Sequence, residues 1–169
     1  IATKTDLLAA KSALSDNDES NFVMFGKTDA TLPSELPVNV EVNRMVSKVV
    51  LKTVNRAFTS AALAALNFSI DEIFITNVAG DVNYGLTDEP VDWYNKMDYN
   101  SELAMFTHDA PAASVANEEA YSSQHTFYCY PNKAADSDAA SWRPRRTRLV
   151  LKTTLGTDTY YYPVTLPEL

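Results

Sequence analysis

The stretch over residues 147–169 constrains the fold more than any other part of the chain, because it has the pattern of two β-strands joined by a tight turn. In the first strand polar residues alternate with Leu149, Leu151 and Leu155, which is the two-residue period of a half-buried strand. Residues 156–158 supply the turn, and the return strand carries Tyr160, Tyr162, Val164 and Leu166. No further strand pattern follows the return strand, so the sequence predicts an open sheet edge at this hairpin. Such an edge must be covered, paired or blunted.

The rest of the chain is also dominated by strand patterns. Apolar runs or alternations occur at residues 21–26, 38–54, 68–75 and 126–130, and one helix is expected over residues 5–14 with Thr5 as its N-cap. No alternation of strands with helices of similar length is present. The pattern therefore predicts about six strands in an all-β, Greek-key β-sandwich with a short N-terminal helix.

Two of the strand patterns change phase along their length. One change follows Arg44, and the other lies at Asp71 and Glu72 within the run 68–75. A change of phase predicts a bulge or a strand that passes between two environments. Residues 57–66 are expected to form a short helix or a turn, residues 77–89 are rich in turn formers, and residues 91–119 lack a period.

Composition excludes several classes of function. The net charge of −8 disfavours nucleic acid as a partner. The single cysteine, Cys129, lies in an aromatic strand and is expected to be a buried, unreactive thiol. No apolar run is long enough for a membrane helix, and residues 1–4 do not resemble a signal peptide, so any export segment is expected to have been removed or left out.

No catalytic, cofactor or metal site is expected. The two histidines, His108 and His125, have no convergent ligand pattern, and no nucleophile-elbow motif occurs. The acidic residues at 16–19 and at 136–138 lack the glycine of a calcium loop. We therefore expect a protein that is not an enzyme.

Several segments, in this order, resemble the Bacteroidetes-type fimbrillins, the pilin subunits of anaerobe fimbriae. Residues 40–50, with Arg44 followed by a small-residue–Lys–Val pattern, are similar to a strand that opens the family's C-terminal domain. Residues 68–78 resemble its second strand, and the aromatic strand 127–132 ends in an asparagine as in the family. Residues 147–150 and 161–164 resemble its penultimate hairpin, and residues 93–97 are a weaker echo. The resemblance covers roughly residues 20–169.

The resemblance implies a structural subunit of cell-surface fimbriae built from transthyretin-like sandwiches. Such subunits are exported to the outer membrane as lipoprotein-type precursors, are trimmed after an arginine, assemble by donor-strand exchange and support adhesion. The implied partners are other fimbrial subunits and a host or bacterial surface ligand. Compared with the family, residues 1–36 are expected to be the remnant of an N-terminal domain with a linker, and residues 37–169 a C-terminal sandwich that lacks its last strand.

Two groups of residues are candidate contact sites. Three interpretations of the arginine cluster remain open: a solvated loop, a docking patch for an acidic neighbouring subunit, or a protease-sensitive site. Its members are Arg143, Arg145, Arg146 and Arg148. The aromatic residues Trp93, Tyr94 and Tyr99 are candidates for a glycan-binding face, or for a plug at the end of the sandwich. A glycan-binding face would give the alternative function, a carbohydrate-binding β-sandwich module of a secreted or surface protein.

Overall fold

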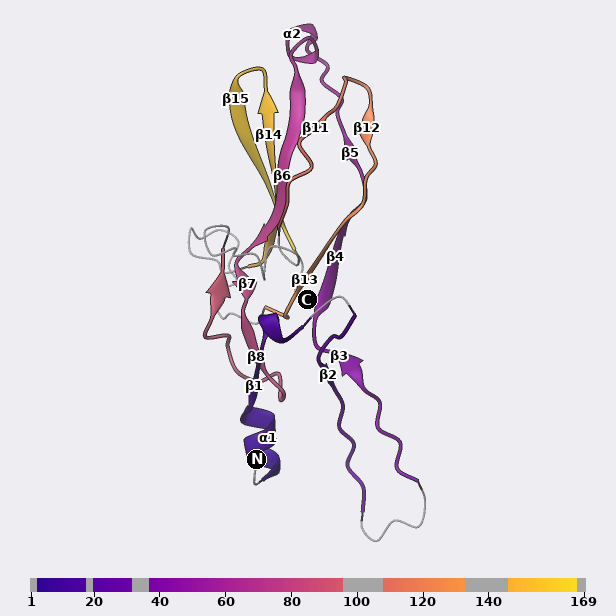
Figure 1. Ribbon diagram of the computed structural model, residues 1–169, viewed down its shortest axis with the longest axis vertical. Helices are drawn as coiled ribbons and strands as arrows, with labels where there is room; N and C mark the ends of the chain where they lie inside the picture. The colour runs from indigo at the N-terminus through magenta and orange to yellow at the C-terminus, as the bar shows by residue number, and fades with distance from the viewer. Residues whose placement is uncertain (1–2, 18–19, 32–36, 96–107, 133–145, 167–169) are drawn as a thin grey trace.

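A long antiparallel ladder between two strands far apart in sequence organises the molecule. The computed structural model describes residues 3–17, 20–31, 37–95, 108–132 and 146–166. In the main sheet, β6 (Phe68–Thr76) pairs with β14 (Arg148–Leu155), which pairs with β15 (Asp158–Thr165). On the other side of β6 lie two short strands, β10 (His108–Asp109) and β11 (Ala113–Ser114). Figure 1 shows β6, β14 and β15 running along the long axis of the molecule.

A second ribbon of strands packs against this sheet. In it β4 (Ser47–Leu51) pairs with β13 (His125–Cys129), and β5 (Val54–Asn55) pairs with β12 (Ala120–Tyr121). Because β5 follows β4 and β13 follows β12 closely in the chain, the two ladders are successive parts of one antiparallel pair. The two layers share one apolar cluster, so the predicted all-β sandwich is confirmed.

The centre of the core comes from β6. Ile70, Ile73 and Ile75 have no exposed surface and share the core with Phe127 and Cys129 of β13. Ile70 pairs with Thr153 and Glu72 pairs with Lys152, which leaves Asp71 as an extra residue. This bulge turns both Ile70 and Ile73 inward, and it confirms the change of phase predicted at Asp71 and Glu72. Each such buried side chain stabilises the fold by about 1.5–3 kcal/mol relative to exposure.

The N-terminal segment differs from its prediction. Helix α1 covers Lys4–Ala9, and a capping box joins Thr3 to Asp6: each accepts a hydrogen bond from the other's backbone N–H. The N-cap is therefore Thr3 rather than Thr5, and the helix does not reach Leu14. It ends early because β1 (Lys11–Ala13) pairs with β8 (Asp81–Asn83) and is followed by a 3-10 turn, η1 (Leu14–Asp16).

The prediction that residues 77–89 form turns is wrong for their first half. This region contains β7 (Val78–Ala79) and β8, and β7 pairs with β9 (Trp93–Tyr94). Val78 and Ala79 are completely buried. Asp81 forms an ion pair with Lys11, and its Oδ1 accepts hydrogen bonds from the N–H groups of Val91 (2.7 Å) and Asp92 (2.9 Å). Burial alone would raise the pKa of Asp81, but these partners outweigh it and lower the pKa.

Tyr130 ties the N-terminal segment to the sandwich. Its buried hydroxyl donates to the carbonyl of Ala13 (3.0 Å), accepts from Nδ2 of Asn17 (2.9 Å) and lies 2.9 Å from Oγ of Ser12. Burial raises the pKa of Tyr130. The β1–β8 ladder and the pairing of β2 (Met24–Phe25) with β3 (Asn43–Arg44) also join residues before position 36 to residues after it. The division into units 1–36 and 37–169 stays a prediction.

An arm of two adjacent chain segments projects from the end of the molecule opposite to helix α2 (Ala61–Ala64), as Figure 1 shows. It starts where β2 (Met24–Phe25) pairs with β3 (Asn43–Arg44), and it continues through residues 26–31 and 37–42, which we call the arm. The strand expected from Val38 onward begins only at Asn43. In the described ranges, no helix is long and apolar enough to cross a membrane.

Candidate functional site

The hairpin of β14 and β15 is the clearest candidate for an intermolecular contact. Its two-residue turn contains Gly156, with a φ of +66°, and Thr157, which has no positive φ. This combination suits a type II′ turn, whose twist matches that of paired strands. The sequence predicted this hairpin, and the structure confirms it. Among the described residues, no strand pairs with the outer side of β15, so the predicted open edge is present.

The direction of the backbone groups along β15 follows from one hydrogen bond. The N–H of Leu166 donates to the carbonyl of Thr147 (3.0 Å). Opposed residues in an antiparallel ladder alternate between bonded and non-bonded pairs, so the even-numbered residues of β15 bond to β14. The odd-numbered residues direct their backbone groups away from β14: Thr159, Tyr161, Pro163 and Thr165. A proline at such a position sacrifices no ladder bond and removes one donor from the free edge.

Both faces of β15 are open to solvent. Every residue from Asp158 to Thr165 is exposed, including Tyr161 (55%) and Val164 (57%). Tyr162 and Val164 lie opposite Leu151 and Leu149, on the face of the sheet that covers the core. The main sheet therefore extends past the second layer of strands, and the core-side face of β15 is left exposed to solvent.

An apolar groove lies beside this exposed face. It has a volume of about 310 Å³ and runs between the hairpin and the β5 segment. Its lining residues are Val54, Asn55, Arg56, Ala57, Phe58, Phe68, Leu151 and Tyr162. A free strand edge next to an apolar groove is the arrangement used in β-augmentation, in which main-chain bonds supply continuity and alternate side chains fill pockets.

Arg56 shapes the end of this groove and was not singled out by the sequence. It is only 6% exposed, and its guanidinium donates to four carbonyls: Val115 (2.8 Å), Leu66 (2.7 Å), Ala64 (2.9 Å) and Leu63 (3.3 Å). It also lies over the rings of Phe58 and Phe68, at 5.4 and 5.5 Å. In the described part of the chain it has no carboxylate partner. Arg56 therefore fixes the loop around α2 to Val115, the residue that directly follows β11.

The predicted arginine cluster is described only in part. Arg143 and Arg145 lie outside the described residues. Arg146 is half-buried, and its carbonyl accepts a hydrogen bond from Nδ2 of Asn77 (3.1 Å). Arg148 is the first residue of β14 and is also half-buried. The role of this cluster as a docking patch stays a prediction.

The predicted aromatic face is also described in part, since Tyr99 lies outside the described residues. Trp93 and Tyr94 are half-buried and pack against the core through the β7–β9 pair. The ring of Tyr94 covers Gly80, where an added Cβ would lie 2.4 Å from Cε2. The glycan-binding interpretation and the plug interpretation both stay predictions.

The two histidines take part in separate pairs. His108 lies 3.1 Å from Glu72 through Nε2. His125 is buried between Asp109, which contacts its Nδ1, and Tyr121, whose hydroxyl lies 2.7 Å from its Nε2. No group of three or more potential metal ligands occurs in the ranges that the structure describes. The Asp109–His125–Tyr121 chain joins β10, β12 and β13, and it was not predicted.

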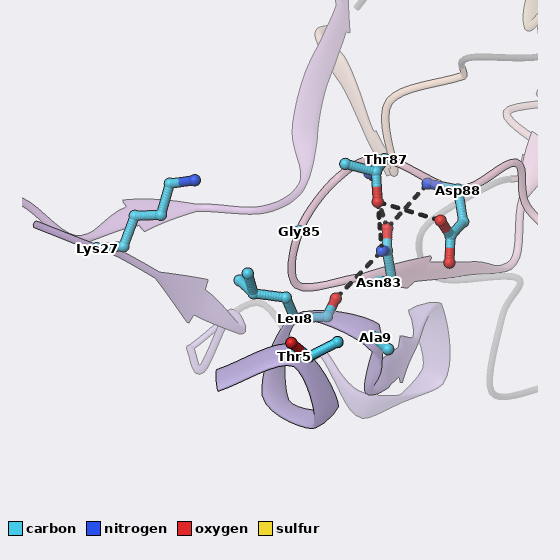
Figure 2. A pocket seen from close by; sticks show the side chains of 8 residues that line it. All are labelled: Thr5, Leu8, Ala9, Lys27, Asn83, Gly85, Thr87 and Asp88. Atoms are coloured by element: carbon cyan, nitrogen blue, oxygen red, sulfur yellow. Dashed lines mark hydrogen bonds between the residues drawn. The ribbon is translucent and has the colours of Figure 1, made fainter. Parts of the chain in front are cut away.

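A smaller cavity of about 250 Å³ lies beside α1, and Figure 2 shows the residues that line it. Its polar centre is Asn83, which donates to the carbonyl of Leu8 (3.1 Å) and to Oγ1 of Thr87 (2.9 Å). The Asn83 oxygen accepts from the N–H groups of Thr87 (3.0 Å) and Asp88 (3.2 Å). The hydrogen-bonding groups of Asn83 are thus used to hold the turn after β8 against the helix.

Comparison with known proteins identifies the fold but no family. No protein-family model and no curated protein matches the chain. A crystal structure of a "putative cell adhesion protein" from Parabacteroides distasonis matches 98% of this chain and 54% of its own, with 16% identity and a TM-score of 0.61. A second protein of the same organism and description matches 98% of this chain and 63% of its own, with 14% identity and a TM-score of 0.55. The chain therefore spans between half and two thirds of these proteins, and it shares its fold with part of each.

Proposed function

We propose that this chain is a non-enzymatic subunit of a bacterial cell-surface fibre, of the fimbrillin type, which assembles by strand addition at β15 and supports adhesion. The observation that carries the proposal is the free edge of β15, exposed on both faces and adjoining an apolar groove. The order of fimbrillin-like segments in the sequence supports it. The description of the two Parabacteroides distasonis proteins as cell adhesion proteins is in agreement.

The proposal includes the partners and the location. Other fimbrial subunits supply the added strand, and a host or bacterial surface molecule is the ligand of the fibre. The subunit reaches the outer membrane as a lipoprotein-type precursor. An added strand would satisfy the backbone groups that β15 directs outward and would cover Tyr162 and Val164.

A single substitution at the edge tests the proposal. Tyr161→Pro removes a backbone N–H that points away from β14, so the β14–β15 ladder keeps its hydrogen bonds. The free edge, which already lacks a donor at Pro163, then loses a second hydrogen-bond donor. We expect this variant to fold normally by circular dichroism and to lose assembly, measured by light scattering and electron microscopy. Tyr161→Phe is the matched control, because it keeps the N–H, and it should assemble as the parent chain does.

Hydrogen exchange gives a second measurement that does not depend on a variant. The amides of Thr159, Tyr161 and Thr165 should become protected when the protein assembles, since they gain partners on the free side. The proposal is overturned if Tyr161→Pro assembles like the parent, or if these amides exchange at the same rate with and without assembly.

A further inference from the structure

The arm carries a second exposed apolar surface. Val38, Val40 and Val42 are 46–48% exposed, and Met24 at the base of the arm is 49% exposed. Residues 37–42 are extended, and they form no backbone hydrogen bond in the described part of the chain. Valine at every second position suits a strand whose one face is buried. This segment has the pattern of a half-buried strand but has no sheet of its own.

The base of the arm determines which side chains share a face. The N–H of Met45 donates to the carbonyl of Val23 (3.1 Å), and Met24 pairs with Arg44. By alternation from this ladder, Val42, Val40 and Val38 lie on the face of Met24. Gly26 lies across from Val42, and a Cβ there would come within 2.1 Å of the Glu41 carbonyl oxygen. Glycine thus lets the two sides of the arm approach each other.

The arm segment suits the edge of β15 chiefly through its apolar face. The apolar groove beside β15 is suited to the valine face. The opposite face of the β14–β15 hairpin carries Arg148 and Lys152, in the pairs with Thr165 and Tyr161, and Lys152 already forms an ion pair with Glu72. Glu41 is the only charged residue in the segment 37–43, and it lies on the face opposite to the valines. When the valines face the groove, Glu41 therefore lies on the side of Arg148.

The lengths and positions of the two surfaces also agree. Six residues span roughly 20 Å in an extended strand, which is less than the eight-residue β15 at about 3.3 Å per residue. Figure 1 shows the arm and the β14–β15 hairpin projecting toward opposite ends of the long axis. A contact between two different surfaces at opposite ends is heterologous, and it produces a filament when the rotation does not close.

We infer that residues 38–43 of one copy add as a strand to β15 of a second copy of this chain, with the three valines turned into the groove. This inference rests on the proposed strand addition at β15 and names the internal arm as its donor. Pro163 lacks a donor, so the pairing has one main-chain bond fewer than an unbroken edge would allow.

Disulfide trapping tests the contact directly. In a Cys129→Ala background, a protein with Asn39→Cys is mixed with proteins that carry Thr159→Cys, Tyr161→Cys or Thr165→Cys. Residues opposite each other on one face of paired strands lie within disulfide range. We expect covalent dimers from at least one of these mixtures under mild oxidation. Leu7→Cys in α1, at a similarly exposed position, is the matched control and should give none with the same edge variants.

Assembly of arm variants separates this inference from the proposed function. Val40→Lys places a charge in the apolar groove, and it should reduce the assembly rate by about tenfold or more. Asn39→Lys, on the other face, should have a much smaller effect. If Tyr161→Pro blocks assembly but Val40→Lys does not and no cross-link forms, the arm is not the donor and strand addition at β15 stands. If neither variant affects assembly, both proposals fail.

Discussion

Pro163 of β15 stands opposite Val150 of β14 in a pair whose main-chain groups point away from each other. The proline therefore leaves the ladder to β14 intact and reduces the capacity of the free edge. Such an edge accepts a strand less readily than an unbroken one, which limits pairing between hairpins of different copies.

Pro163→Ala should increase association through this edge, because it restores an outward N–H. The variant should assemble faster than the parent at equal concentration, measured by light scattering. Pro131→Ala is the matched control. It also increases the conformational entropy of the unfolded chain, but it adds no N–H donor to β15. Equal assembly rates for the two variants would contradict the assignment of Pro163 to the free side.

Arg56→Lys should destabilise the end of the molecule around α2. A lysine cannot reach the carbonyls of Val115 and Leu66 at once, and bonds to a charged donor contribute about 1.5–3 kcal/mol each. We expect a loss of about 2–4 kcal/mol in the free energy of unfolding by urea denaturation. Lys52→Ala, at an exposed position nearby, should stay within about 0.5 kcal/mol of the parent. A similar loss of unfolding free energy for Arg56→Lys and Lys52→Ala would contradict a stabilising role of the guanidinium–carbonyl hydrogen bonds.

Asp81 should make stability depend on pH on the acid side. Its pKa is lowered in the folded state, so its contribution is present above the unfolded value of 3.8 and is lost as the pH falls through the folded pKa. Urea midpoints measured between about pH 2 and pH 6 should fall more steeply for the parent than for Asp81→Asn. Asp29→Asn, at an exposed ion pair with Lys4, should follow the parent. Identical slopes for the parent and Asp81→Asn would be evidence against this role.

Tyr130→Phe should cost about 1–3 kcal/mol, because Ser12, Asn17 and the Ala13 carbonyl lose a common partner in a buried site. The raised pKa of Tyr130 gives a second signature with the opposite sign to Asp81. Its contribution is complete below the unfolded pKa of 10 and declines as the pH rises above it. Thermal unfolding above pH 10 should show this decline in the parent and less of it in the variant.

Cys129 should be inert in the folded protein. Burial raises its pKa to about 12, so the reactive thiolate is scarce at neutral pH. A thiol reagent at pH 8 should label it only in denaturant, whereas an engineered Asn39→Cys should react at once in the native protein. Rapid native labelling of Cys129 would contradict the burial of its thiol.

Local pattern was sufficient for the parts of the fold in which each strand buries one face. The hairpin around Gly156, the strand ending at Cys129 and the bulge at Asp71 could all be predicted, because apolar alternation and turn chemistry agree there. The outward position of Pro163 could also have been derived, since a two-residue turn fixes the parity of every later residue in the strand.

The remaining features depend on partners that are distant in sequence. Val78 and Val82 sit among turn formers, and only pairing with β9 and β1 makes their segments strands. The helix ends at Ala9 because residues 11–13 pair with β8, which local propensity does not reveal. Arg56 could not be found from sequence, because its partners are carbonyls that any residue can supply.

The ladder between β6 and β14 runs along the long axis of the molecule (Figure 1). Antiparallel hydrogen bonds lie perpendicular to their strands. A pull between the arm at one end and the hairpin at the other therefore loads these bonds together in shear, instead of opening them one after another. In the proposed fibre, this orientation would make the sandwich resist tension along the long axis, and the force needed to rupture a subunit would depend on the direction of pulling.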